Sequence, residues 1–144
     1  MSEIPIKEAE EGKPQMILCT GLASGREQMT PEMIGINLRS AKSPDNSGTV
    51  LRDVKINEDG PDGIFSDLPV RAMEKALKEA GIPAAISLSA GSYVCNDVLY
   101  SLLDHFSKSP TRCGFVHMPP QEKIPPETAA RGLLCCLEAM IREC

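Results

Sequence analysis

A cysteine and a histidine, Cys95 and His117, lie 22 positions apart in settings that suit thiol chemistry. Cys95 follows a turn through Gly91 and opens a segment with helical periodicity, whereas His117 ends the apolar run that starts at Cys113. At a helix start the backbone amides favour a thiolate, and an imidazole nearby can take and return the thiol proton. The two residues therefore predict Cys95 as a nucleophile and His117 as its base.

The other thiols and the second histidine favour a different interpretation. A cysteine within an apolar segment commonly packs as a small hydrophobic residue, and this alternative stays open for Cys95 itself. Packing of this kind is expected of the other five cysteines, which are Cys19, Cys113, Cys135, Cys136 and Cys144. No C-x-x-C spacing occurs, so neither a disulfide framework nor a zinc site is predicted, and no metal or cofactor is expected. His105 lies within a predicted helix beside Asp104 and is expected to be solvated.

Composition narrows the class of protein. The 144 residues suffice for one domain. The net charge is −5 with scattered basic residues, and only 3% of residues are aromatic, so neither nucleic acid nor an anionic membrane is an expected partner. No apolar run approaches the ~20 residues of a membrane span. Reduced cysteines and an acidic N-terminus without a signal-peptide pattern predict a cytoplasmic protein.

Strand and helix patterns alternate along the chain. Strands are predicted over residues 16–20, 33–38, 84–88 and 113–117; helices are predicted from a cap at Ser66 or Asp67 to Gly81, over 95–106, and from Pro125 onward. Residues 39–65 are expected to form a long functional loop with an edge hairpin at 54–56. The alternation predicts an α/β fold, a three-layer α/β/α sandwich around a mostly parallel, twisted sheet. Residues 1–15 are expected to be a polar lead-in to a single domain over 16–144.

Six motifs taken together resemble the pyroglutamyl peptidase I family, the pyrrolidone carboxyl peptidases, which are cysteine peptidases. They are residues 21–26 (GLASGR), 30–32 (TPE), 44–46 (PDN), 58–61 (EDGP), 90–96 (AGSYVCN) and 114–119 (GFVHMP). They occur in the family's order and close to its spacing, from about residue 14 to the C-terminus. By composition alone Glu32 is expected to be a surface carboxylate in a helix first turn, and only the resemblance gives it a catalytic role.

The resemblance implies a Glu32–Cys95–His117 triad that removes an N-terminal pyroglutamate by thiol acyl transfer, the reaction of a cysteine omega-peptidase. Cys95 would attack the carbonyl, His117 would pass the proton to the departing amine, and Glu32 would orient the imidazole. The backbone amide of Cys95 would help to bind the oxyanion. The resemblance also places Tyr93 and Leu22 at the substrate slot.

Departures from the family pattern qualify these expectations. Met33 stands where the family usually has an arginine after the catalytic glutamate, and Lys42 stands where an arginine assists the oxyanion. The family's first strand and its aromatic Gly-Phe-x-Pro-Phe loop are not found, and residues 3–6 resemble the family's later second strand. A chain truncated in this way is expected to carry the triad but to turn over slowly, and a family leader segment is expected to restore the rate.

Three interpretations of function remain open at this point. The first is a pyroglutamyl peptidase acting on N-terminally pyroglutamylated peptides, with homo-oligomers expected because family members are often tetramers. The second is a non-catalytic truncated homologue that keeps the fold. The third is another amidase that uses the same Cys95 and His117 pair. Activity on a pyroglutamyl amide separates the first from the others.

Overall fold

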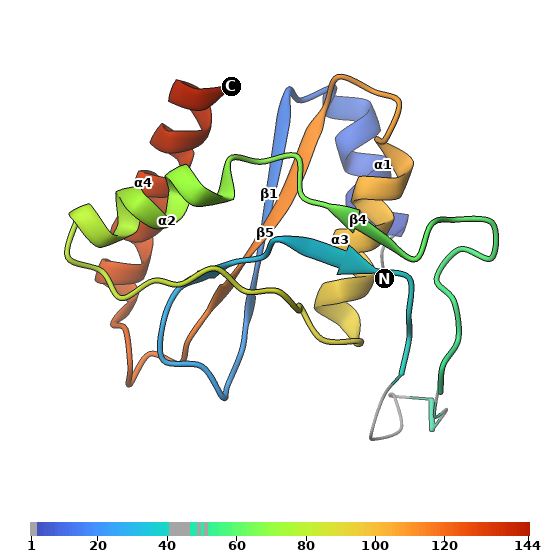
Figure 1. The fold of residues 1–144 in the computed structure, drawn as a ribbon, viewed down its shortest axis with the longest axis horizontal. Coiled ribbons are helices and arrows are strands. Elements are labelled where there is room, and N and C mark those ends of the chain that lie inside the picture. Colours follow the sequence, from blue (N-terminus) through green and yellow to red (C-terminus); the bar gives the residue numbers. More distant parts are fainter. Residues whose placement is uncertain (1–2, 41–46, 49, 51) are drawn as a thin grey trace.

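A pair of parallel strands forms the centre of the molecule in the computed structural model, which describes residues 3–40, 47–48, 50 and 52–144. Strand β1 (Met16–Leu22) pairs along its whole length with β5 (Arg112–Met118), and the register places Gly21 opposite His117. Figure 1 shows β1 and β5 side by side at the centre. The short β2 (Thr30–Pro31) adds antiparallel to the other edge of β5, giving the strand order β1-β5-β2. The sheet is therefore mixed, with its long pair parallel as expected.

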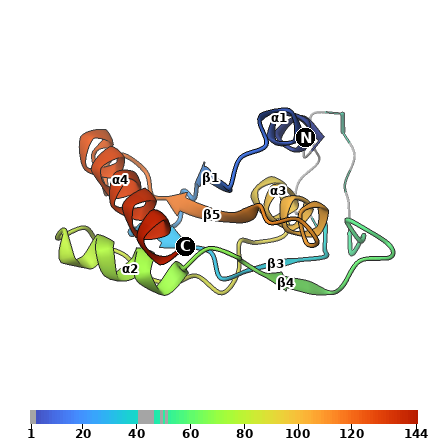
Figure 2. The same ribbon diagram turned by 90° about the horizontal axis from the view of Figure 1, so that it is seen from above.

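Helices cover both faces of the strand pair. Figure 2 shows α1 (Glu3–Gly12) and α3 (Val94–His105) on one side, and α2 (Val70–Glu79) and α4 (Pro126–Glu143) on the other. Successive side chains of a strand point to opposite faces; accordingly Phe115 packs in the core under α3, and Val116 packs in the core under α2 and α4. This arrangement confirms the predicted α/β/α sandwich.

A second, two-stranded sheet lies against α3. Strands β3 (Ile34–Ile36) and β4 (Gly63–Phe65) pair antiparallel within this sheet. Helix α3 approaches β3 so closely that a Cβ at Gly35 would lie 3.1 Å from the backbone of Tyr100. β4 falls inside residues 39–65, which were expected to be a loop, because the Gly, Asp and Pro content of this stretch hides a strand of three residues.

The structure shows that the polar lead-in predicted for residues 1–15 is wrong. Residues 3–12 form α1 rather than a loose lead-in, and residues 3–6 are helical rather than a strand. The helix is held because Ala9 is buried and Ile6 packs against the core under α3. Glu8, Glu10 and Glu11 are exposed, and Glu10 Oε1 lies 2.5 Å from Nε2 of His105, a residue expected only to be solvated.

The predicted strand over 84–88 is an interrupted one. Single parallel bridges join Met29 to Ala84 and Glu32 to Ser87. Backbone hydrogen bonds form on either side of Pro31, but this residue has no amide hydrogen to donate, so the ladder between the two segments is interrupted there. The expected edge hairpin at 54–56 is likewise reduced to one bridge, between Arg39 and Val54.

The three predicted helices occur within a few residues of their expected bounds, but the expected cap of α2 is wrong. Pro69 precedes this helix and no side chain caps it. The Ser66 hydroxyl instead donates to the carbonyl of Cys113 at 3.2 Å and accepts from the Leu68 amide at 3.2 Å. Within the described residues, no helix combines the length and the apolar character needed to cross a membrane.

Candidate active site

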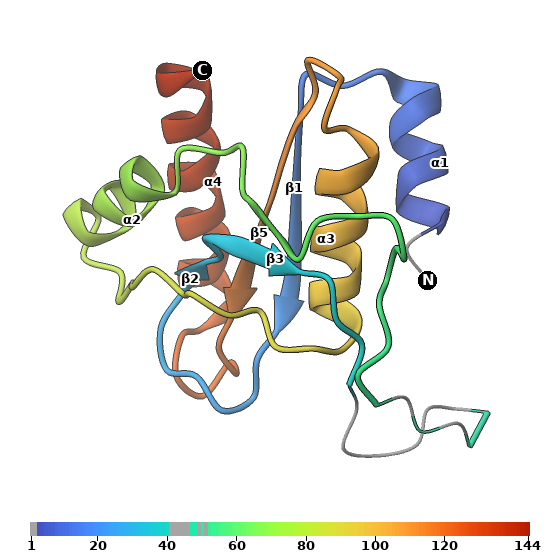
Figure 3. The same ribbon diagram turned by 45° about the vertical axis from the view of Figure 1, so that its right-hand side comes forward.

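Cys95 and His117 meet at one end of the sheet. Figure 3 shows the arrowheads of β1 and β5 pointing to the end at which α3 begins. Cys95 lies in the first turn of α3 and His117 lies near the end of β5, and the Cys95 side chain is close enough to the imidazole to help raise the pKa of His117. Gly21 makes this approach possible, because a Cβ there would lie 2.9 Å from the sulfur of Cys95 and 2.9 Å from Cζ of Phe115.

The turn before α3 presents Cys95 to the site. Gly91 has a φ of +84°, a left-handed conformation that side chains rarely adopt and that a glycine enters without cost. Tyr93 precedes the helix, so the amide of Cys95 belongs to the first turn, in which amides have no acceptor within the helix. The thiol is partly exposed. A thiol so placed has both access to substrate and a helix N-terminus beside it.

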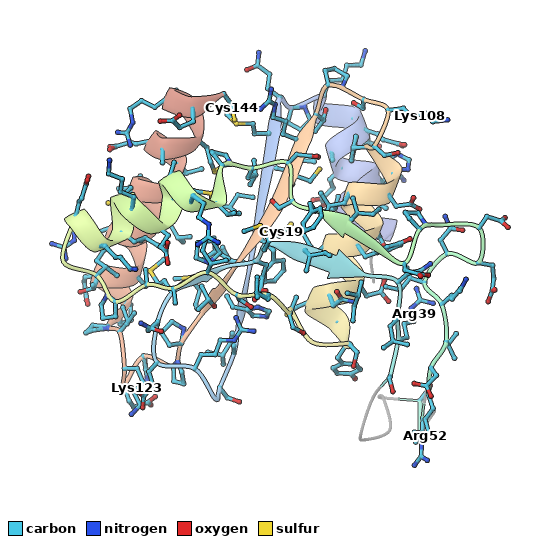
Figure 4. The ribbon with its side chains drawn as sticks, in the orientation of Figure 1. Cys19, Arg39, Arg52, Lys108, Lys123 and Cys144 are labelled. Atoms are coloured by element: carbon cyan, nitrogen blue, oxygen red, sulfur yellow. The ribbon has the colours of Figure 1, made fainter. Side chains whose placement is uncertain are left out.

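Four of the other cysteines pack in or against the core as expected, whereas the same expectation is wrong for Cys144, which is exposed. Burial raises the pKa of the Cys136 thiol, and burial with the nearby Asp67 raises that of Cys113, each to about 12. Burial also raises the pKa of Cys19. Cys144 is exposed at the end of α4, far from the loop that carries Lys123 in Figure 4. These thiols have no imidazole partner comparable with His117 among the described hydrogen bonds.

Glu32 is fully buried and contacts His117, contrary to the surface position that composition alone favours. Its Oε1 lies 2.8 Å from Nδ1 of His117, and the two side chains are 0% and 5% exposed. The cause is the short β2: the Glu32 amide just after it donates to the Phe115 carbonyl at 2.9 Å, which brings Glu32 beside β5. Nδ1 of His117 is thereby engaged, and Nε2 remains for Cys95.

The site favours charged forms of both partners of this pair. Burial opposes ionisation of Glu32, but hydrogen bonds, led by that of His117, and the charge of Arg26 lower its pKa below the ordinary value. Burial likewise opposes the imidazolium, yet hydrogen bonds to Cys95 and Glu32 and their negative charges raise the pKa of His117 to about 9. The proton on His117 therefore stabilises the fold below pH 6.5, and this contribution is lost as the pH rises through about 9.

Arg26 belongs to the site although no role was predicted for it. Its Nη1 donates to Glu32 Oε1 at 2.6 Å. Residues 21–26 were noted only as part of a motif and a turn. A basic residue in a short turn six positions before a carboxylate was the available signal, but spacing alone does not show that the two side chains meet.

Of the residues predicted to bind substrate, two are exposed beside the site in sequence and the third lies outside the described residues. Leu22 and Tyr93 are 66% and 54% exposed, next to Gly21 and just before Cys95 respectively. Lys42 lies outside the described residues. Met33, where the family usually has arginine, is half-buried and its amide donates to the Ser87 carbonyl at 2.9 Å. In the described part of the chain, no group of three or more His, Cys, Asp or Glu residues could hold a metal ion.

Comparison with known families gives the same assignment as the motifs. The family model described as pyroglutamyl peptidase matches residues 2–141. The chain belongs to the pyroglutamyl peptidase family. A pyrrolidone-carboxylate peptidase of Bacillus subtilis is 44% identical over 119 residues, which cover 80% of this chain and 55% of that protein. One of Brevibacillus brevis is 40% identical over 144 residues, which cover 92% and 67%. The chain thus spans between about half and two thirds of these relatives.

Solved structures of the pyroglutamyl peptidase family share the fold. The pyroglutamyl peptidase I of Bacillus amyloliquefaciens aligns with a TM-score of 0.89 and 31% identity, covering 96% of this chain and 71% of that one. A mutant pyrrolidone carboxyl peptidase from the hyperthermophile Pyrococcus furiosus aligns with a TM-score of 0.91 and 36% identity, covering 99% and 76%. The α/β arrangement that joins Cys95 to His117 is therefore a family fold.

Proposed function

We propose that this protein is a cysteine omega-peptidase that hydrolyses the amide bond after an N-terminal pyroglutamate. The single observation that carries the proposal is the relay from Cys95 through His117 to Glu32, in a chain that belongs to the pyroglutamyl peptidase family. The relatives named pyrrolidone-carboxylate peptidase support the substrate class. The six free cysteines support a reducing compartment, such as the cytoplasm, for this activity.

The chemistry follows from the protons that each group holds. Cys95 gives its proton to Nε2 of His117, and the thiolate attacks the pyroglutamyl carbonyl carbon. As the tetrahedral adduct collapses, the C–N bond breaks and the imidazolium protonates the leaving amine, which leaves a thioester on Cys95. His117 then takes a proton from water, whose hydroxide attacks the thioester and releases pyroglutamate, and the proton returns to the sulfur. Glu32 stays ionised and keeps the imidazole oriented throughout.

Two further groups of residues complete the proposed site. The Cys95 amide at the start of α3 would donate to the oxyanion, with Lys42 as the charge that replaces the family arginine. Pyroglutamate is uncharged and has no free amine, so an apolar rim suits it. Tyr93, two positions before Cys95, and Leu22, next to Gly21, are both exposed and would form such a rim.

Hydrolysis of a fluorogenic pyroglutamyl amide tests the proposal. We expect release of the fluorophore from this amide and at least about a hundredfold lower kcat/KM on the matched prolyl amide, which lacks the ring carbonyl that the site would bind. The alanyl amide of the same fluorophore serves as a second control. No turnover of any amide would favour a non-catalytic homologue, and equal turnover of all three would favour another Cys–His amidase.

A further inference from the structure

The buried carboxylate of Glu32 depends on a second partner besides His117. Oε1 accepts from His117 Nδ1 at 2.8 Å and from Arg26 Nη1 at 2.6 Å. Oε2 is buried and makes no hydrogen bond of ordinary geometry among the described residues, although the Ser87 side chain lies near enough to help lower the pKa of Glu32. An ionised carboxylate with one unsatisfied oxygen is costly in a dry interior. Among the described side chains, Arg26 is the one arginine or lysine that forms an ion pair with Glu32.

The guanidinium of Arg26 also joins the segments that carry the relay. Its Nη1 donates to Thr30 Oγ1 at 2.6 Å, within β2, and its Nη2 donates to the Ser89 carbonyl at 2.8 Å. Ser89 belongs to the loop that leads into the Cys95 turn. One planar group therefore contacts the strand before Glu32, the carboxylate itself and the loop before the nucleophile. Only the fork of an arginine can reach all three acceptors together.

We propose that Arg26 is a positioning residue of the active site, which holds Glu32 ionised and its Oε1 against His117 while fixing the loop that presents Cys95. This inference rests on the proposed function for its catalytic meaning. The proton balance gives the mechanism. When Cys95 passes its proton to His117, the imidazolium needs the negative Glu32 beside Nδ1. If Glu32 takes up a proton instead, that counter-charge is lost and the proton returns to the sulfur.

A purely structural role for Arg26 makes a different prediction. An arginine that merely ties loops together would lower thermal stability when removed, without changing the pH at which the thiol becomes reactive. An arginine that keeps Glu32 ionised would shift that pH, because a nearby opposite charge moves a carboxyl pKa by about 1–3 units. Arg26 is 27% exposed at its side chain, and solvent screening favours the lower end of this range.

The test is the pH dependence of Cys95 alkylation by iodoacetamide, followed by mass spectrometry of the Cys95 peptide. In Arg26→Gln we expect the acid limb of the rate profile to move up by about one pH unit. Arg26→Lys keeps the charge but loses the fork. Its acid limb should lie close to that of the unchanged protein, and its alkylation rate at the plateau should stay lower. Arg112→Gln, at the opposite end of β5, is the matched control and should keep the wild-type profile.

A wild-type acid limb in Arg26→Gln overturns the inference, whatever its melting temperature. If Arg26→Gln does not fold, Thr30→Val carries the test, because it removes one acceptor that fixes the guanidinium. A smaller shift in the same direction supports the inference and no shift overturns it. Turnover of the pyroglutamyl amide is measured in parallel on the unchanged protein. If the unchanged protein shows no turnover but the alkylation profile shifts in Arg26→Gln, the proposed function alone is refuted. If turnover is normal but the alkylation profile does not shift, the role of Arg26 alone is refuted.

Discussion

Replacing Cys95 by serine is expected to lower kcat/KM on a pyroglutamyl amide by at least about a thousandfold, since losing a triad nucleophile removes most of the rate enhancement. Serine is close to cysteine in size and fits beside Gly21, but its hydroxyl ionises far less readily than a thiol. The measurement is steady-state turnover of the fluorogenic amide. Circular dichroism of the same sample shows whether the fold is unchanged.

Cys135→Ser is the matched control for this variant. Cys135 is partly buried on α4, on the face of the sheet opposite α3, and contributes only to packing. We expect its turnover to stay within about threefold of the unchanged protein, because a mild packing change does not reach the relay. Equal losses in the two serine variants would show that the chemistry does not depend on Cys95 in particular.

The second large effect is expected from His117→Ala, which should reduce turnover by about 10²–10⁴-fold, the usual contribution of general acid–base catalysis. In the unchanged protein, activity should fall as the pH rises through about 9, the pKa of His117, because the imidazolium that protonates the leaving amine is lost. That alkaline limb should be absent from any residual activity of His117→Ala. Turnover measured between pH 6 and 10 checks both expectations.

His105→Ala serves as the control histidine. His105 lies at the end of α3 and pairs with Glu10 on α1, at the opposite end of the sheet from His117. We expect wild-type turnover and a wild-type alkaline limb. The free energy of unfolding should fall slightly, because the contact between α1 and α3 through His105 is removed. If His105→Ala and His117→Ala have the same pH profile, the pairing of His117 with Cys95 is wrong.

The core of the site was predictable because it depends on local rules. A turn with Gly91 before a helix places Cys95 at a helix start, and an apolar run ending in His117 places this residue at a strand end. The carboxyl ends of parallel strands lie at the same end of a sheet, and α3 begins at that end of β1 and β5 (Figure 3), which brings Cys95 and His117 together. The helices α2, α3 and α4 followed from apolar periodicity in the same way.

The position of Glu32 could not be predicted from local sequence. Its burial depends on β2, which has only two residues and pairs with β5 about 85 positions further along the chain. A pairing of that range leaves no periodic pattern, so the motif resemblance was needed. The contact of Arg26 with Glu32 follows from the same pairing and was missed.

The N-terminal helix was missed for another reason. Pro5 and a run of acidic residues disfavour a buried element by composition, and the helix is stable because Ala9 and Ile6 pack on α3. Such tertiary packing overrides weak helix propensity. Of the two-stranded sheet, β3 lies within the strand predicted over 33–38, but β4 was missed because it has only three residues and is separated from its partner by the long segment between Ile36 and Gly63.

Selective alkylation of the unchanged protein tests most directly whether Cys95 is the activated thiol. Limiting iodoacetamide at about pH 6, where an ordinary thiol with a pKa near 8.5 is almost entirely protonated, is followed by peptide mapping of all six cysteines. We predict that Cys95 is labelled first, well before exposed Cys144 and partly buried Cys135. Labelling of Cys135 or Cys144 at the same rate as Cys95 would contradict the account.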